Sequence, residues 1–139
     1  IKMLEVKVVA PDGVKYDSSD VLSVTIPTQD GVITVLEDHV PLISILRPGE
    51  VEIEKEDHVV YLAVSSGILQ VEKNSKVTFM ADTAERAEDI NIEKAEEAKK
   101  RVEEFMQEQE RVSDIDFAKL QAKIEKEMAR IRVGKKYKR

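Results

Sequence analysis

The sequence predicts an antiparallel β-sandwich or barrel, followed by two antiparallel α-helices. Up to about residue 84, short segments alternate apolar and polar residues, and turn residues separate them. Beyond residue 84, Gly and Pro are absent until Gly134, and apolar residues recur every three or four positions. Short strands with regular turns are typical of sandwiches and barrels. Apolar residues at every third or fourth position, as found beyond residue 84, are typical of amphipathic helices.

The strands are predicted from the alternation itself. In the second segment, for example, Leu22, Val24 and Ile26 fall on one face. The predicted strand segments are 4–10, 21–27, 51–56, 58–65, 67–72 and 76–82. Turn chemistry is found at 11–13 (PDG), 29–31 (QDG), 47–50 (RPGE) and 72–76 (EKNSK), and 54–58 (EKEDH) is a predicted hairpin tip.

The helices are predicted from two apolar series. The first contains Ala95, Ala98, Val102 and Phe105; the second contains Phe117, Leu120, Ile124, Met128 and Ile131. Ser113 or Asp114 is the predicted N-cap of the second helix, and the short connection favours an antiparallel hairpin.

The predicted seam between the helices is thin, because the first helix contributes mainly alanine. Alanine buries little apolar area, so closing the hairpin gains little free energy. We therefore expect a hairpin that can open or detach, with a permanently folded helical cap as the alternative.

Composition excludes several function classes. The 139 residues carry a net charge of −6, no Cys and two His, which leaves no disulfide, no thiol nucleophile and little basis for a metal site. No apolar run is long enough to span a membrane, so we expect a soluble, intracellular protein. Residues 119–139 contain nine Lys and Arg against two Glu. This basic end is interpreted as a solvated tail, a surface that docks on an acidic protein, or a nucleic-acid contact.

The dipeptide Asp38-His39 is the one feature that suggests catalysis. A catalytic triad needs an activated Ser, but the VSSGIL segment lacks the first glycine of a nucleophile elbow. No phosphate-binding glycine loop is present either. We therefore interpret EDHVP as a turn in which Asp38 bonds local backbone N–H groups and Pro41 fixes the exit.

Several stretches together resemble a known family. They are VVAPDGVKYDSSDVLSVTIPTQDGVITVLEDHVPLI, YLAVSSGILQVEKNSKVTFMADTAERAEDI and EMARIRV, and they are similar to the epsilon subunit of bacterial and chloroplast F-type ATP synthases. The resemblance implies a ten-stranded β-sandwich at 1–86 that binds the gamma subunit and the c ring, and a regulatory helical hairpin at 87–139.

The resemblance also implies a function without catalysis. The chain would be a central-stalk rotor subunit that couples proton translocation to ATP synthesis, and its extended hairpin would inhibit ATP hydrolysis at the alpha and beta subunits. It would lie peripherally, through the complex, on the cytoplasmic face of a bacterial membrane or on a thylakoid. Nucleic acid is not an expected partner.

Site residues are carried over by position. The c-ring docking loops would be Thr28, Gln29, Asp30, Gly31, Glu37, Asp38 and His39, and the second loop is more acidic than is usual in the family. The inhibitory cations would be Lys123, Lys126, Arg130 and Arg132.

No cofactor is predicted, although ATP is a candidate regulatory ligand. Some family members bind ATP through Ile/Leu-Asp-x-x-Arg-Ala, where this chain has Asn91 for the Asp and Lys94 for the Arg. Lys cannot make the bidentate contact of Arg, which puts the motif in doubt, although Glu85 and Arg86 match. Two rival functions are an adaptor outside the ATP synthase, whose hairpin binds another partner, and a small hydrolase that uses His39.

Overall fold

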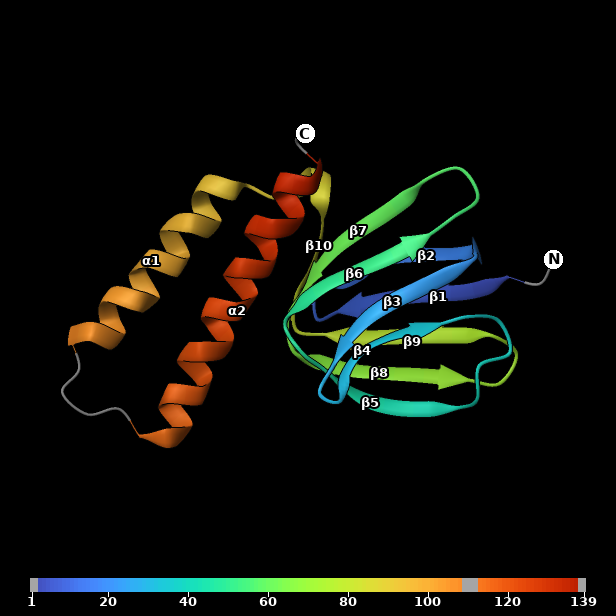
Figure 1. The fold of residues 1–139 in the computed structure, drawn as a ribbon, viewed down its shortest axis with the longest axis horizontal. Helices are drawn as coiled ribbons and strands as arrows, with labels where there is room; N and C mark the ends of the chain where they lie inside the picture. The colour runs from blue at the N-terminus through green and yellow to red at the C-terminus, as the bar shows by residue number, and fades with distance from the viewer. Residues whose placement is uncertain (1–2, 109–112, 138–139) are drawn as a thin grey trace.

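The computed structural model describes residues 3–108 and 113–137, which form a β-sandwich followed by two helices (Figure 1). The strands are β1 (Leu4–Ala10), β2 (Gly13–Val21), β3 (Ser23–Thr28), β4 (Gly31–Val35), β5 (Leu42–Leu46), β6 (Gly49–Glu54), β7 (Val59–Val64), β8 (Gly67–Glu72), β9 (Lys76–Ala81) and β10 (Ala84–Arg86). The helices are the 3-10 turn η1 (Ala87–Asp89), α1 (Ile92–Glu108) and α2 (Asp114–Tyr137). The predicted fold class is confirmed.

One continuous sheet folds over on itself to make the sandwich. Its strand order is β10-β7-β6-β3-β5-β8-β9-β1-β2, and β4 pairs with β3. A single bridge between Thr28 and Leu46 joins β3 to β5, and so joins the two halves of the sheet. The prediction of an antiparallel sheet is wrong at one place, because β1 and β9 pair in parallel.

The core lies between the two layers and is built from the alternating positions. Leu4, Val6 and Val8 of β1 are fully buried, as are Val51 and Ile53 of β6. Aliphatic side chains supply most of this core, and each one fully buried contributes about 1.5–3 kcal/mol.

Two of the predicted turns depend on glycine. Gly13 and Gly31 have φ values of 130° and 116°, a region that side chains with a Cβ avoid. They close the β1–β2 and β3–β4 hairpins. Sequence position alone therefore places these two hairpin tips correctly.

The helices lie on one side of the sandwich, with α2 between α1 and the strands (Figure 1). Side-chain caps start both helices: the Asn91 Oδ1 accepts a hydrogen bond from the Lys94 N–H at 3.0 Å, and the Ser113 Oγ accepts one from the Asp116 N–H at 3.1 Å. Within the described residues, we find no helix whose length and hydrophobicity would allow it to cross a membrane.

The predicted contact face of α2 is wrong in part. Phe117 and Met128 of the predicted series are largely exposed, whereas the fully buried residues of α2 are Ala129 and Val133. The helix has two neighbours, α1 and the sandwich, so one stripe cannot describe its contacts. Small residues mark the face that approaches the sheet closely.

Candidate functional site

The candidate site is the seat of α2, defined here as the surface of β6, β7, β10 and η1 on which the C-terminal half of α2 rests. Val133 is fully buried against Ala63, Ala87 and Ile90. The packing is close at Gly134, where an added Cβ would lie 2.8 Å from the Ile92 Cγ1 atom. The last turns of α2 are therefore fitted to this surface.

Carboxylates on the sandwich side of the seated helix form ion pairs with its cations. The Lys136 Nζ donates a hydrogen bond to the Glu50 Oε1 at 2.6 Å and lies 3.8 Å from the Glu52 Oε1. The Arg132 Nε is 4.0 Å from the Glu50 Oε2. Lys136 also lies 5.1 Å from the centre of the Tyr61 ring, a cation–π contact. One glutamate, Glu50, thus holds two cations of α2.

A second cluster joins α2 to β10. The Arg130 Nη1 donates a hydrogen bond to the Glu127 Oε1 at 2.6 Å, and its Nη2 donates to the Glu85 Oε2 at 3.4 Å. The Arg130 Nε is 2.7 Å from the Glu85 Oε1, but its N–H has no hydrogen-bond geometry, so that contact is ionic only. Glu127 is buried, and its ion pair with Arg130 compensates the loss of solvent around its charge.

The pKa shifts describe the electrostatics of the seat. Burial, and then the neighbouring carboxyl of Glu50, raise the pKa of Glu52. The hydrogen bond to Glu50 raises the pKa of Lys136. Burial disfavours the charged form of Arg130, but the hydrogen bond to Glu127 and the charge of Glu85 outweigh it and raise the pKa of Arg130. The seat therefore favours cations on α2.

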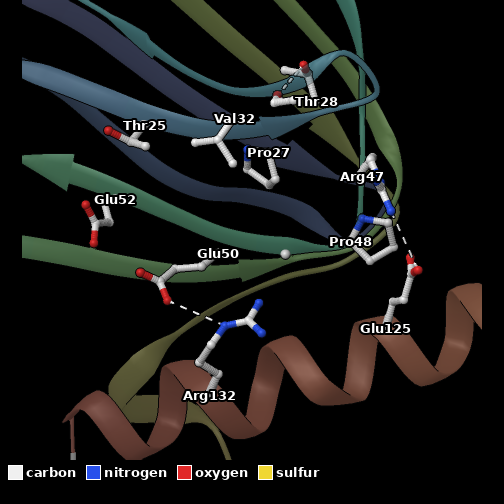
Figure 2. A pocket seen from close by; sticks show the side chains of 12 residues that line it. Thr25, Pro27, Thr28, Val32, Arg47, Pro48, Glu50, Glu52, Glu125 and Arg132 are labelled. Carbon is white, nitrogen blue, oxygen red and sulfur yellow. Dashed lines mark hydrogen bonds and ion pairs between the residues drawn. The ribbon is translucent and has the colours of Figure 1, made fainter.

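A groove of about 370 Å³ runs between α2 and the outer face of the sheet (Figure 2). Thr28, Pro27 and Val32 line the side formed by β3 and β4, and Glu125 and Arg132 line the side formed by α2. The Arg47 Nη2 and the Glu125 Oε1 lie 3.7 Å apart across it.

The structure separates the two predicted c-ring docking loops. The turn 28–31 lies at the groove beside α2, where the Thr28 Oγ1 donates a hydrogen bond to the Gly31 carbonyl oxygen at 2.6 Å. The loop with Glu37, Asp38 and His39 follows the other end of β4, roughly 16 Å away at about 3.3 Å per strand residue. The two loops therefore lie at opposite ends of β4, and whether either meets a c ring stays a prediction.

The loop at 37–39 has the form of a structural turn. Asp38 has a φ of 58°, and its N–H donates a hydrogen bond to the Ser75 Oγ at 2.8 Å. The His39 Nδ1 lies 2.7 Å from the Val40 carbonyl oxygen, to which it can only donate. Ser65 accepts a hydrogen bond from the Thr83 N–H, so this serine serves the backbone.

Three of the four candidate ATP contacts have partners within the protein. Glu85 pairs with Arg130, and Arg86 lies 5.3 Å from the centre of the Tyr16 ring. The Asn91 side chain caps α1 through the Lys94 N–H. The side chains of Glu85, Arg86 and Asn91 thus already have protein partners, and regulation by ATP stays a prediction.

The four predicted inhibitory cations fall into two pairs. Arg130 and Arg132 are engaged with sandwich glutamates, whereas Lys123 and Lys126 line a small cavity with Ser65 and Ser66. The basic tail at 138–139 lies outside the described residues. Sequence reasoning missed Glu50, Lys136 and Gly134; the one available signal was a glycine inside a predicted helix.

An exposed apolar row crosses the opposite half of the sheet. In register order it runs through β5, β8, β9, β1 and β2 and consists of Ile45, Ile68, Met80, Val9 and Val14. We call this row the apolar ladder. Four of its five side chains are 45–56% exposed, and the fifth, Val9, is half-buried. Contiguous apolar surface of this kind is typical of an interface.

Family models match almost the whole chain. Residues 3–87 match the β-sandwich domain of the ATP synthase delta/epsilon chain, and residues 88–135 match its long α-helix domain. The chain belongs to the delta/epsilon chain family of ATP synthases. The ATP synthase epsilon chain of Lactobacillus gasseri is 36% identical over 98% of this chain and 95% of its own length. That of Chloroflexus aggregans is 40% identical over 87% and 85%.

Solved structures agree on the fold. A chain of the Euglena gracilis mitochondrial ATP synthase superposes with a TM-score of 0.74 at 21% identity, over 90% of this chain and 77% of that one. A chain of the Tetrahymena thermophila mitochondrial ATP synthase gives 0.66 at 11% identity, over 99% and 98%. Membership in the epsilon family confirms the resemblance seen in the sequence. It also supports the prediction that the chain is a non-catalytic subunit.

Proposed function

We propose that this chain is a rotor subunit of an ATP synthase, in which the sandwich docks on the central stalk and the hairpin restrains ATP hydrolysis. Family membership supports the assignment to the enzyme. The apolar ladder is the observation that supports docking, because a free subunit has no use for an exposed apolar row across five strands. Family membership counts against an adaptor outside the ATP synthase and against a hydrolase.

The gamma subunit is the proposed partner of the ladder. Ile43 lies beside the ladder on β5 and is also exposed, which widens the apolar strip. A flat outer sheet face with an apolar strip suits a rigid shaft, because burial of the strip stabilises the contact without ordering any loop. The sandwich would then turn with the shaft.

The c ring is the proposed partner of strand β4. This strand is attached to the sheet only through β3, and it joins the two predicted docking loops. Val32, Leu36 and Val40 are exposed along it and beyond its end. A contact along the whole strand would include both loops.

The hairpin is the proposed regulatory element. Released from its seat, α2 presents Lys123, Lys126, Arg130 and Arg132 to acidic segments of the beta subunits, and this contact blocks hydrolysis. The seated hairpin leaves the catalytic subunits free. Coupling of proton translocation to synthesis follows from the sandwich, which transmits rotation between the c ring and gamma. The complex places the chain on the cytoplasmic face of a membrane.

The proposed docking of the sandwich on the gamma subunit is tested by placing charged residues in the apolar ladder. Ile68→Lys with Met80→Lys should abolish co-purification with the gamma subunit while leaving the isolated protein folded, because both side chains point away from the core. Val59→Lys, exposed but off the ladder, is the matched control. Assembly that survives the double change at wild-type yield rejects the ladder as the interface.

The proposed inhibition of ATP hydrolysis by the hairpin is tested by deleting the hairpin in the assembled enzyme. Deleting residues 87–139, which leaves β10 intact, should raise ATP hydrolysis and keep ATP synthesis coupled to the proton gradient. An unchanged hydrolysis rate in a complex that retains the truncated chain rejects inhibition by the hairpin.

A further inference from the structure

We propose that the sandwich competes with the acidic partner of α2 for the same cations, and that Glu50, Glu85 and Gly134 set how firmly α2 is held. The inference rests on the proposed function, since the competing partner is the catalytic head named there. It adds that sandwich residues, remote from any inhibitory contact, determine the strength of inhibition.

The cations of α2 are engaged while the helix is seated. Arg130 is bound to Glu85, and Arg132 and Lys136 meet at Glu50, whose side chain is only 13% exposed. Arg130, only 18% exposed between Glu85 and Glu127, is covered by the seat, whereas Arg132 is 54% exposed and is held only in part. Seating and inhibition are therefore alternatives for the same side chains.

Close packing at Gly134 of α2 is the second feature that holds the seated helix. A glycine inside a helix lowers the helix population about fivefold relative to alanine, so its presence in α2 needs a reason. The reason is the close contact with the start of α1 and the linker before it, because an added Cβ would lie 2.8 Å from the Cγ1 of Ile92, the first residue of α1, and 3.2 Å from the Ile90 Cγ2. Ile90 also belongs to the buried cluster of the seat, so this contact is made where the hairpin meets the sandwich. Alanine at this position would raise the helix propensity of α2 in every state. Its Cβ would crowd Ile90 and Ile92, and so disfavour the seated position.

The neighbouring strand positions supply an internal control. Glu54 is on β6, four residues beyond Glu50, and it accepts a hydrogen bond from the Ser23 Oγ at 3.0 Å. A glutamine there keeps an acceptor for Ser23 and leaves the ion pairs of α2 intact. Glu50→Gln and Glu54→Gln therefore remove the same charge from the same strand, one within the seat and one outside it.

The first experiment follows the seat in the isolated full-length chain. The protein has no Cys, so fluorophores can be placed on Glu56→Cys in the β6–β7 turn and Ala118→Cys in α2. Gly134→Ala, through the crowded Cβ, and Glu50→Gln and Glu85→Gln, through the lost ion pairs, should each raise the unseated fraction by about fivefold. Glu54→Gln should leave it unchanged. Equal distances in Glu50→Gln, Glu54→Gln and the parent protein overturn the proposal, even if Gly134→Ala fails to fold.

The second experiment uses the assembled enzyme. The same three variants should lower ATP hydrolysis relative to the parent complex, a gain of inhibition produced from outside the inhibitory contact. If truncation at residue 87 raises hydrolysis but the unseating variants do not lower it, the competition is refuted while the proposed function stands. If neither change affects hydrolysis, the proposed inhibition itself is refuted.

Discussion

Val133→Ala tests most sharply whether the hairpin is a separable unit. Val133 is fully buried in the seat, and the substitution removes two methyl groups at roughly 0.8 kcal/mol each. The residual cavity brings the loss to about 2 kcal/mol, which is about a 30-fold change in the seating equilibrium. The sandwich core shares no buried cluster with Val133, so the loss should fall on α2 alone.

Native-state hydrogen exchange resolves the two parts of the molecule. Once unseated, α2 keeps only α1 as a neighbour, and such an isolated helix pair protects its amides poorly. In Val133→Ala, amides near Ala129 should exchange about 30-fold faster, while those of the core strands β8 and β9 keep their protection. Local opening predicts this difference between the parts.

Ile115→Ala is the matched control, because it makes a similar gain in helix propensity within α2 at a side chain that is 71% exposed. Its exchange should stay close to that of the parent. The reasoning is refuted if Val133→Ala accelerates core and helix amides equally, since the chain would then unfold as one unit. It is also refuted if α2 exchanges no faster than in the control.

Further predictions concern the cap, the seat and the inhibitory contact. Asn91→Ala should destabilise α1 by about 1 kcal/mol, seen as lower helicity on heating, because the Lys94 N–H loses its acceptor; an unchanged melting curve contradicts the cap. Glu52→Gln should leave the seat as firm or firmer, since its raised pKa means that its ionised form costs stability above that pKa, and a looser seat in the label assay contradicts this sign. Lys123→Glu with Lys126→Glu should relieve inhibition without unseating α2, because the ion pairs of the seat described above involve Arg130 and Lys136; full inhibition in an ATP hydrolysis assay rejects electrostatic docking.

The sequence predicts the parts of the fold that follow from local periodicity. The alternation of Leu4, Val6 and Val8 requires one buried face in any sandwich, and Gly13 and Gly31 require tight turns. The parallel pairing of β1 and β9 follows from long-range closure of the sheet, which no local pattern encodes. The three-residue strand β10 is too short to show a period.

The candidate site was predicted less well, because its chemistry lies between distant segments. Arg130 and Arg132 were singled out for an acidic partner in another subunit, yet the structure finds acidic partners within the chain, at Glu85 and Glu50. Those glutamates alternate with core residues on their strands, so sequence reading treats them as solvent-facing, although both are partly buried in the structure. Gly134 was visible as the first glycine after residue 84, but its meaning appears only when Ile92 is beside it.

The central claim is that the hairpin leaves its seat when the enzyme is inhibited. It is tested directly by the distance between labels on Glu56→Cys and Ala118→Cys within the assembled complex, measured during ATP hydrolysis and again in the inhibited state. The account predicts the distance of the isolated, seated chain during hydrolysis and a changed distance on inhibition. The same distance in both states would contradict it.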